Sequence, residues 1–313
     1  MHSKREFLTG VGAGLGLAAA AAVAPAFAQD APLSTPAGVD EGPRPRKKVP
    51  NRMAKTTPLF KSPGRWPNAL GSSPRGLWVG EQHLLKSNAA SVNVPWPTHT
   101  NKEQAWLMDL TGKILMQRES DSSNMVGVVE GNGSLWIAAD DDAPKAGIYK
   151  VDLASGKQTA HLQVPLSPGG ISGHLHGLQW QDGKLWVSND RMKSLMRIDP
   201  MTWTPELEIP MFTPPGMSRY HGITIDKDGS ILQVIADDQS TSYKDPRFVA
   251  GLSRMDQDGK AIETITFVPG SCDPHGLAYH DGQLYGCDAG YHPGWHTNYD
   301  SPFSAMIFRI DII

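Results

Sequence analysis

Residues 176–190 read HGLQWQDGKLWVSND, and the same frame returns twice further along the chain. Residues 221–238 read HGITIDKDGSILQVIADD, and residues 275–290 read HGLAYHDGQLYGCDAG. A fourth copy begins at Val126, where valine stands in the histidine position, and a weaker fifth copy begins at Ala69. Similarity that returns at a fixed period indicates a repeat architecture.

Each repeat contains the signals of four short strands. Asn-Gly or Asp-Gly pairs at 132–133, 182–183, 228–229 and 281–282 lie between strand-forming runs, which is typical of tight hairpins. A third strand returns as WLMDL, IYKVDL, LMRIDP, LSRMDQ and IFRIDI. The matching large residues Trp78, Trp136, Trp186, Leu232 and Tyr285 are 46 to 58 residues apart. This pattern predicts an all-β chain that forms a single β-propeller of four-stranded blades, with five blades counted and six possible.

The last repeat ends at IFRIDII and therefore lacks its outer strand. We expect the segment around residues 52–60 to supply that strand and so to close the ring with an N-terminal strand. The propeller is accordingly assigned to residues 51–313.

The frame His-Gly-Ile/Leu, followed by Asp-Gly-x-Leu-Trp-Val-x-Asp, resembles NHL-repeat, gluconolactonase-like and streptogramin-lyase-like propellers from about Leu70 to the C-terminus. Such propellers include lyases, lactonases and plain binding modules, so the resemblance implies the fold more firmly than an activity. Streptogramin lyases and peptide-amidating lyases use channel histidines with a metal for elimination, which implies that role for His176, His221 and His275. Gluconolactonase-like relatives bind a divalent ion with Glu, Asn and Asp, the residue types of Glu81 and Asn189.

The three histidines also stand out without the resemblance, because each opens an inner strand at an equivalent position. Their side chains should converge on the central channel. Three imidazoles with an open coordination position are typical of a divalent metal site, here zinc, manganese, magnesium or calcium. A hydrogen-bonded histidine ring around trapped water is the alternative.

Other polar residues are expected on the same face. The second strands end there, which makes Glu81 a candidate base and Asn189, Asp237 and Asp288 candidate substrate contacts, with turn capping as the alternative. His174 lies two residues before His176, and the loop 289–304 carries Tyr291, His292, Trp295 and His296. Aromatic and imidazole groups over a pocket suit a small-molecule substrate. Cys272 and Cys287 flank the last hairpin, and their pairing is left open.

The composition of the chain argues against some classes of binding partner. The net charge is −3, with 29 Lys and Arg against 32 Asp and Glu, so no basic surface for nucleic acid is indicated. Ser/His/Asp nucleophile motifs and Gly-rich phosphate loops are absent from the sequence. We therefore predict a monomeric, metal-dependent lyase or hydrolase that acts on a small molecule. The alternative is a non-catalytic ligand-binding or scaffolding propeller.

The N-terminus indicates export to the periplasm or beyond. Residues 3–9 read SKREFLT and precede an apolar run from Gly10 to Ala24 and the sequence Ala26-Phe27-Ala28. This arrangement is typical of a signal peptide over residues 1–28, with twin-arginine character although Lys4 replaces the first arginine. The ordinary secretory route and a retained membrane anchor remain alternatives. Residues 29–50 form a Pro-rich, flexible lead-in, and no membrane contact is expected after cleavage.

Cleavage after Ala28 is directly testable. The protein produced in a bacterial host with its full leader should begin at Gln29 in the periplasmic fraction, as read by N-terminal sequencing and intact mass. A chain that keeps residues 1–28 would contradict this assignment.

Overall fold

A computed structural model describes residues 49–91, 94–141, 145–163, 175–190, 192–212, 214, 217, 219–236, 250–290 and 305–313. All of these belong to one compact unit, Lys48–Ile313. Its described elements are strands apart from one short helix, α1 (Lys86–Ser91). Within the described residues, none of the helical segments is both long and apolar enough to cross a membrane.

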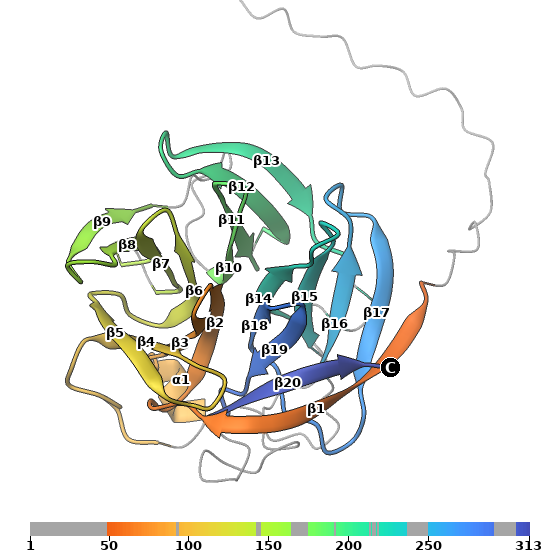
Figure 1. The fold of residues 1–313 in the computed structure, drawn as a ribbon, viewed down its shortest axis with the longest axis horizontal. Coiled ribbons are helices and arrows are strands. Elements are labelled where there is room, and N and C mark those ends of the chain that lie inside the picture. The colour runs from red at the N-terminus through yellow and green to blue at the C-terminus, as the bar shows by residue number, and fades with distance from the viewer. Residues whose placement is uncertain are drawn as a thin grey trace, which may run out of the picture. The chain divides into compact units, whose positions relative to one another are not determined.

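The strands group into four-stranded antiparallel units arranged around an axis (Figure 1). The first unit is β2 (Pro67–Ser73), β3 (Gly76–Glu81), β4 (Glu103–Met108) and β5 (Ile114–Ser120). The second is β6 (Met125–Gly131), β7 (Ser134–Ala139), β8 (Gly147–Asp152) and β9 (Gln158–Leu162). The third is β10 (Leu175–Gln181), β11 (Lys184–Asn189), β12 (Ser194–Asp199) and β13 (Thr204–Pro210).

The remaining strands form one eight-stranded sheet that contains two further units. The fourth unit is β14 (Arg219–Ile225), β15 (Ile231–Ala236), β16 (Ala250–Met255) and β17 (Ala261–Phe267). The fifth is β18 (Gly276–His280), β19 (Gln283–Cys287), β20 (Met306–Ile312) and, from the other end of the chain, β1 (Asn51–Lys61). Strand β1 pairs antiparallel with β20 from Ala54↔Ile312 to Lys61↔Met306, as predicted for residues 52–60. It also pairs parallel with β17 and so links the last two units.

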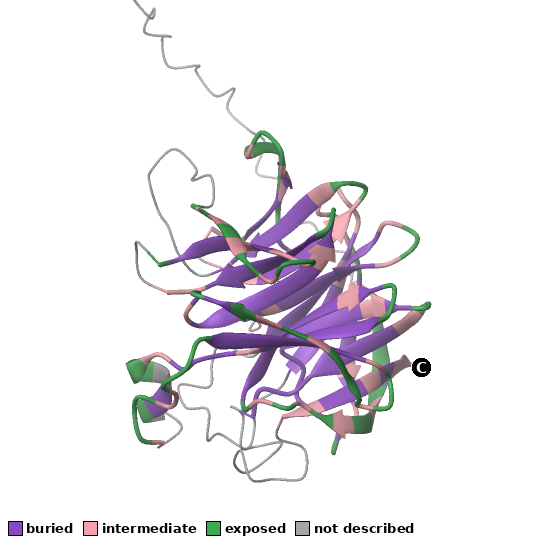
Figure 2. Ribbon diagram, turned by 60° about the vertical axis from the view of Figure 1, so that its left-hand side comes forward, coloured by how far each residue is buried: buried purple, intermediate pink, exposed green. Residues whose placement is uncertain are grey.

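The first strand of each unit lies on the inside of the ring. Strands β2, β6, β10, β14 and β18 pack in that order, and β18 packs against β2. The chain is therefore an all-β, propeller-like fold, as the repeats predicted. Figure 2 shows the buried positions running along the strands, with exposed residues at the turns and outer edges.

Glycine sets how closely the first strands approach one another. A Cβ atom on Gly222 would lie 2.5 Å from the carbonyl oxygen of His275 and 2.8 Å from the Cα atom of Gly276. The N–H of Gly222 donates to that same carbonyl oxygen at 2.7 Å. A Cβ atom on Gly276 would lie 2.6 Å from the nitrogen of Leu70. Backbone thus meets backbone at these positions, which leaves no space for a side chain.

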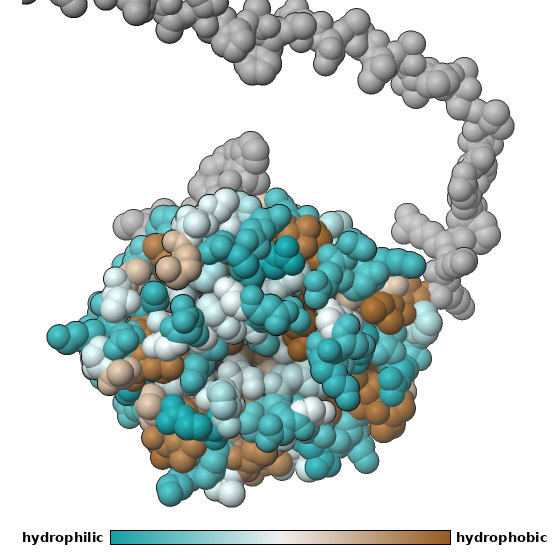
Figure 3. Space-filling model, turned by 45° about the horizontal axis from the view of Figure 1, so that its top comes forward, coloured by the Kyte–Doolittle hydropathy of each residue, from teal (hydrophilic) through white to brown (hydrophobic). Residues whose placement is uncertain are grey.

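Large aromatic side chains fill the space between units. Trp78, Trp136 and Trp186 occupy equivalent places on the second strands, and each is at most 1% exposed. The Trp78 indole N–H donates to Glu130 at 2.8 Å, which joins the first unit to the second. Apolar residues that do reach the surface lie scattered over a mainly hydrophilic face in the view of Figure 3. Buried aromatic side chains between neighbouring units therefore stabilise the fold, as is expected for the blades of a propeller.

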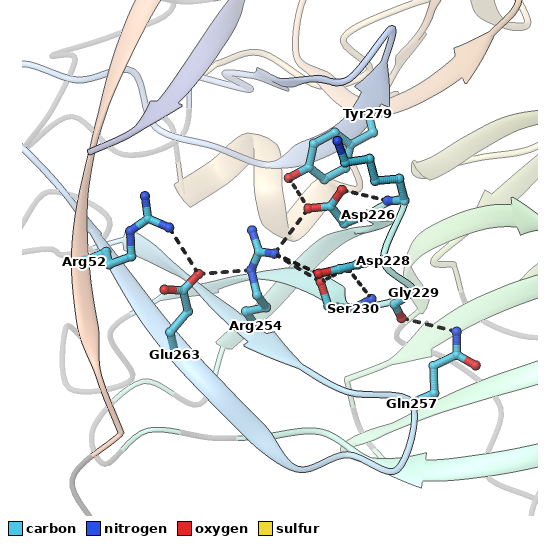
Figure 4. A network of polar contacts seen from close by, with 10 residues as sticks. Arg52, Asp226, Asp228, Gly229, Ser230, Arg254, Gln257, Glu263 and Tyr279 are labelled. Carbon is cyan, nitrogen blue, oxygen red and sulfur yellow. Dashed lines mark hydrogen bonds and ion pairs between the residues drawn. The ribbon is translucent and has the colours of Figure 1, made fainter.

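A charged network fixes the junction between the fourth unit, the fifth unit and β1 (Figure 4). Arg254 contacts Glu263 at 3.0 Å and Asp226 at 3.2 Å, and the Tyr279 hydroxyl donates to Asp226 at 2.9 Å. Arg52 of β1 reaches Glu263 at 4.0 Å. Because Asp226 follows the end of β14, the network lies at the opposite end of that strand from His221.

Substitution of Gly222 tests the backbone contact. Gly222→Ala should lower the free energy of unfolding by at least about 2 kcal/mol, because the added methyl group meets main-chain atoms that cannot move aside. The equivalent residue in the first unit is Ala69, whose Cβ is accommodated opposite Gly80. Ala69→Gly should therefore cost only about 1 kcal/mol. Denaturant unfolding of both variants gives the comparison, and equal losses would contradict the packing argument.

Candidate functional site

An irregularity near the start of the first strands places the candidate site residues. In the first three units the pairing with the second strand skips one residue, namely Asn68, Val126 and His176. In the fourth unit the skip lies between Tyr220 and Ile223 and includes His221. His275 directly precedes β18, where its N–H donates to the Cys287 carbonyl at 2.8 Å. A bulge turns the skipped side chain away from the regular ladder direction.

The structure places the three histidines side by side. The ring centroids of His176 and His221 are 5.1 Å apart with perpendicular planes, and those of His221 and His275 are 4.5 Å apart. Val126 is buried in an apolar cluster with Leu175 and Leu178. Asn68, also buried, is the fifth member of the set and lies one residue before Ala69, the predicted start of that repeat.

A carboxylate accompanies each of the outer two histidines. The distance from Asp140 Oδ2 to His176 Nε2 is 3.8 Å, and that from Asp273 Oδ2 to His275 Nδ1 is 3.6 Å. These are ion-pair distances and are longer than hydrogen bonds. His275 and Asp273 are each 1% exposed. Among the described residues, the buried Nδ1 atom of His176 has no hydrogen-bond partner. Each outer ring therefore has one nitrogen toward a carboxylate and one directed elsewhere.

The donor types suit a divalent ion, since imidazole binds zinc and manganese and a carboxylate behind a ligating histidine is common. In the part of the chain that the structure describes, however, no group of three or more His, Cys, Asp or Glu side chains is arranged to hold a metal ion. The bound metal therefore stays a prediction.

Glu81 belongs to a neighbouring cluster and does not contact the three histidines. Its Oε2 atom is 3.6 Å from His83 Nε2, and its Oε1 atom accepts the Arg65 N–H at 3.2 Å. The His83 ring stacks on His99 with centroids 3.3 Å apart. Burial, followed by the neighbouring His83, lowers the pKa of His99 to about 4, against a smaller opposing effect of Glu81.

Two of the residues predicted to contact substrate, Asn189 and Asp288, accept hydrogen bonds from backbone N–H groups. The Asn189 side chain accepts the Met192 N–H at 3.0 Å, as a turn cap does. Asp288 is fully buried and accepts N–H groups from Gly290 at 2.7 Å and Asp273 at 3.3 Å. The other predicted substrate contacts, His174, Asp237, Tyr291, His292, Trp295 and His296, lie outside the described residues.

A buried glutamate that sequence reasoning did not select supports the same face. Glu103 is fully buried, and burial raises its pKa in spite of the hydrogen bonds that it accepts. It accepts the His83 and Met125 N–H groups at 2.8 Å each and the Ser122 hydroxyl at 2.6 Å. It therefore fixes the His83 segment to the start of β6. Its only sequence signal is an acidic residue at the start of a strand.

The two cysteines are free and buried. Burial raises the pKa of the Cys272 thiol to about 12 and that of Cys287 further still. Cys287 lies opposite Gly276 in the pairing of β18 with β19, and its sulfur accepts the Gly276 N–H.

No protein-family model matches the chain, and no curated protein matches it either. Among solved structures, the chain is similar to Myxococcus xanthus glutaminyl cyclase, with a TM-score of 0.54, 10% identity, and coverage of 85% of this chain and 100% of that one. Kuenenia stuttgartiensis hydrazine synthase matches with a TM-score of 0.41, 12% identity, and coverage of 81% and 64%. The first likeness supports the propeller-like fold and, at this identity, shows the fold alone.

The pKa of His99 predicts a specific dependence of stability on pH. Because folding lowers this pKa from 6.5 to about 4, the unfolded chain binds more protons in that interval, so stability should fall as the pH drops from about 6.5 to 4. His99→Gln should flatten this part of the curve, whereas His161→Gln, on the outer strand β9, should follow the wild type. Thermal unfolding between pH 7.5 and pH 4 gives the comparison. A wild-type slope retained in His99→Gln would contradict it.

Proposed function

We propose that the chain is an exported propeller enzyme that transforms a small molecule at the row formed by His176, His221 and His275. The proposed reaction is either the elimination of a leaving group or the hydrolysis of a cyclic ester, supported by a divalent ion. The observation that carries the proposal is the contact of three imidazoles from three different units, with a carboxylate beside each outer ring.

The two carboxylate–imidazole pairs are suited to proton transfer. A carboxylate at one ring nitrogen orients the imidazole and stabilises the cation that forms when the other nitrogen takes up a proton. In His176 the nitrogen that remains is Nδ1, and in His275 it is Nε2. A base and an acid are thus available on the two sides of His221.

Both reactions need that combination. In an elimination, one imidazole removes the proton next to an activating group, while the other protonates the departing oxygen. In the hydrolysis of a lactone, one imidazole takes a proton from the attacking water and the other protonates the ring oxygen as the ester opens. Glu81, the base candidate from the sequence, contacts His83. Asp140 and Asp273 are the carboxylates that lie beside the histidines, and we assign them the supporting role.

A divalent ion, when bound, would polarise a substrate oxygen and acidify a coordinated water molecule. The residues that would hold it are His176, His221 and His275, the outer two through the nitrogens that do not face a carboxylate. Because a nitrogen that binds the ion cannot also transfer a proton, with the ion in place the coordinated water would serve as the base, and Asp140 and Asp273 would orient the ligating rings. We further propose that the loop residues Tyr291, His292, Trp295 and His296, with His174 and Asp237, contact the substrate.

The second candidate is a non-catalytic propeller that binds or scaffolds a ligand on the same face. The finding that favours it is that no three metal-ligating side chains among the described residues are arranged around one point. The two candidates differ in whether the bound molecule is changed.

Metal content and turnover separate the two functions. The mature protein, purified without chelator, should carry roughly one zinc or manganese ion per chain and should hydrolyse a lactone or eliminate from a lyase substrate in a panel, with loss of turnover in EDTA. His176→Ala and His275→Ala should lose at least about 100-fold in kcat/KM, because the loss of one acid or base costs that much. The matched control is His161→Ala, which changes an exposed histidine of β9 and should behave as the wild type.

The contrary outcomes are equally definite. Turnover that is unchanged in His176→Ala and His275→Ala would remove the histidine row from the reaction. A folded protein that binds members of the panel, converts none of them and carries no metal would establish the binding propeller.

A further inference from the structure

We propose that Asn68, Gln82 and Asn124 act as positioning residues that hold Asp140 against His176. The inference rests on the proposed function in that it gives these three amides a role at the same histidine row. None of them touches an imidazole in the described contacts, so their effect passes through Asp140.

The three side chains form a continuous chain of hydrogen bonds. Asn68 Nδ2 donates to Gln82 Oε1 at 2.9 Å, Gln82 Nε2 donates to Asn124 Oδ1, and Asn124 Nδ2 donates to the carbonyl oxygen of Asp140. The three side chains belong to residues that are 2–4% exposed. The chain thus runs under the surface from β2 in the first unit to the end of β7 in the second.

The direction of this chain is fixed by its last member. A backbone carbonyl can only accept, so Asn124 must present its NH₂ group to Asp140 and its oxygen to Gln82. Gln82 must then present its NH₂ group to Asn124 and its oxygen to Asn68. Every amide therefore has a single orientation that satisfies its neighbours, and replacing one of these NH₂ groups by an acceptor breaks the chain at that point.

Asn124 binds both backbone polar groups of Asp140. Besides the side-chain bond to the Asp140 carbonyl, the Asn124 carbonyl oxygen accepts the Asp140 N–H at 3.0 Å. Asn124 has a φ angle of 63°, in the left-handed region that asparagine tolerates better than most residues. The position is therefore built around an asparagine, and the main chain of Asp140 is held while its carboxylate lies 3.8 Å from His176 Nε2.

The histidine at the other end of the row provides an internal reference. His275 has its carboxylate, Asp273, two residues earlier in its own segment, and that residue lies in another unit from the amide chain. A change that acts through the chain should therefore alter His176 and leave His275 unchanged, whereas general loosening of the fold should alter both.

The test uses variants that keep size and shape. Asn124→Asp and Gln82→Glu replace the donating NH₂ group by an acceptor, and Gln82→Met interrupts the chain with a neutral side chain in case a buried carboxylate prevents folding. The matched control is Gln104→Glu, a buried amide of the first unit that bonds Lys102 and Glu119 and lies outside the chain. The readout is the ¹⁵N spectrum of the histidine rings in metal-free, full-length mature protein, which reports which ring nitrogen carries the proton.

In the wild type and in Gln104→Glu, His176 should carry its proton on Nε2, which faces Asp140. In the chain variants that preference should give way to a mixture of the two tautomers, with His275 unchanged and kcat lowered about tenfold at a similar KM. Folded chain variants whose His176 spectrum matches that of the wild type would overturn the positioning role. Because the spectrum needs no substrate, that failure is distinct from failure of the proposed function, which His176→Ala turnover tests.

Discussion

The hydrogen bond from the Gly222 N–H to the His275 carbonyl brings two neighbouring first strands into backbone contact. This contact is possible only because neither Gly222 nor Gly276 carries a side chain. A histidine directly precedes each glycine in sequence. Because the two strands lie so close, the rings of His221 and His275 have centroids 4.5 Å apart. The glycine that packs the ring and the histidine that lines it are consecutive in sequence. A shift of the backbone at Gly222 or Gly276 would therefore also move the adjacent histidine.

The two ends of the first strands use charged residues differently. Around Arg254 the opposite charges meet at 3.0–3.2 Å and bridge three parts of the sheet, which is the pattern of a structural network. Around the histidines the gaps to the carboxylates are 3.6–3.8 Å. These gaps are longer than a direct hydrogen bond between carboxylate and ring. This contrast supports a structural role at one end and chemistry at the other.

Much of this arrangement was predictable from sequence because it is local and periodic. The Asp-Gly hairpins, the four-strand repeats and the equivalent positions of His176, His221 and His275 follow from spacing alone. Asn68 was missed because alanine replaces the glycine that marks the frame. The sequence also did not show that Glu81 contacts His83, because the regular alternation of side chains is not maintained beyond the strand end. The amide chain to Asp140 joins residues up to 72 positions apart, and no periodicity connects them.

The central claim is that side chains from three separate units form one chemical centre. Crystals of the mature protein soaked in a zinc or manganese salt, with diffraction measured on both sides of the metal absorption edge, test it most directly. One anomalous peak is expected within about 2.0–2.2 Å of nitrogen atoms from His176, His221 and His275. No peak at the three rings, or a peak bound by the His83 and His99 cluster alone, would contradict it.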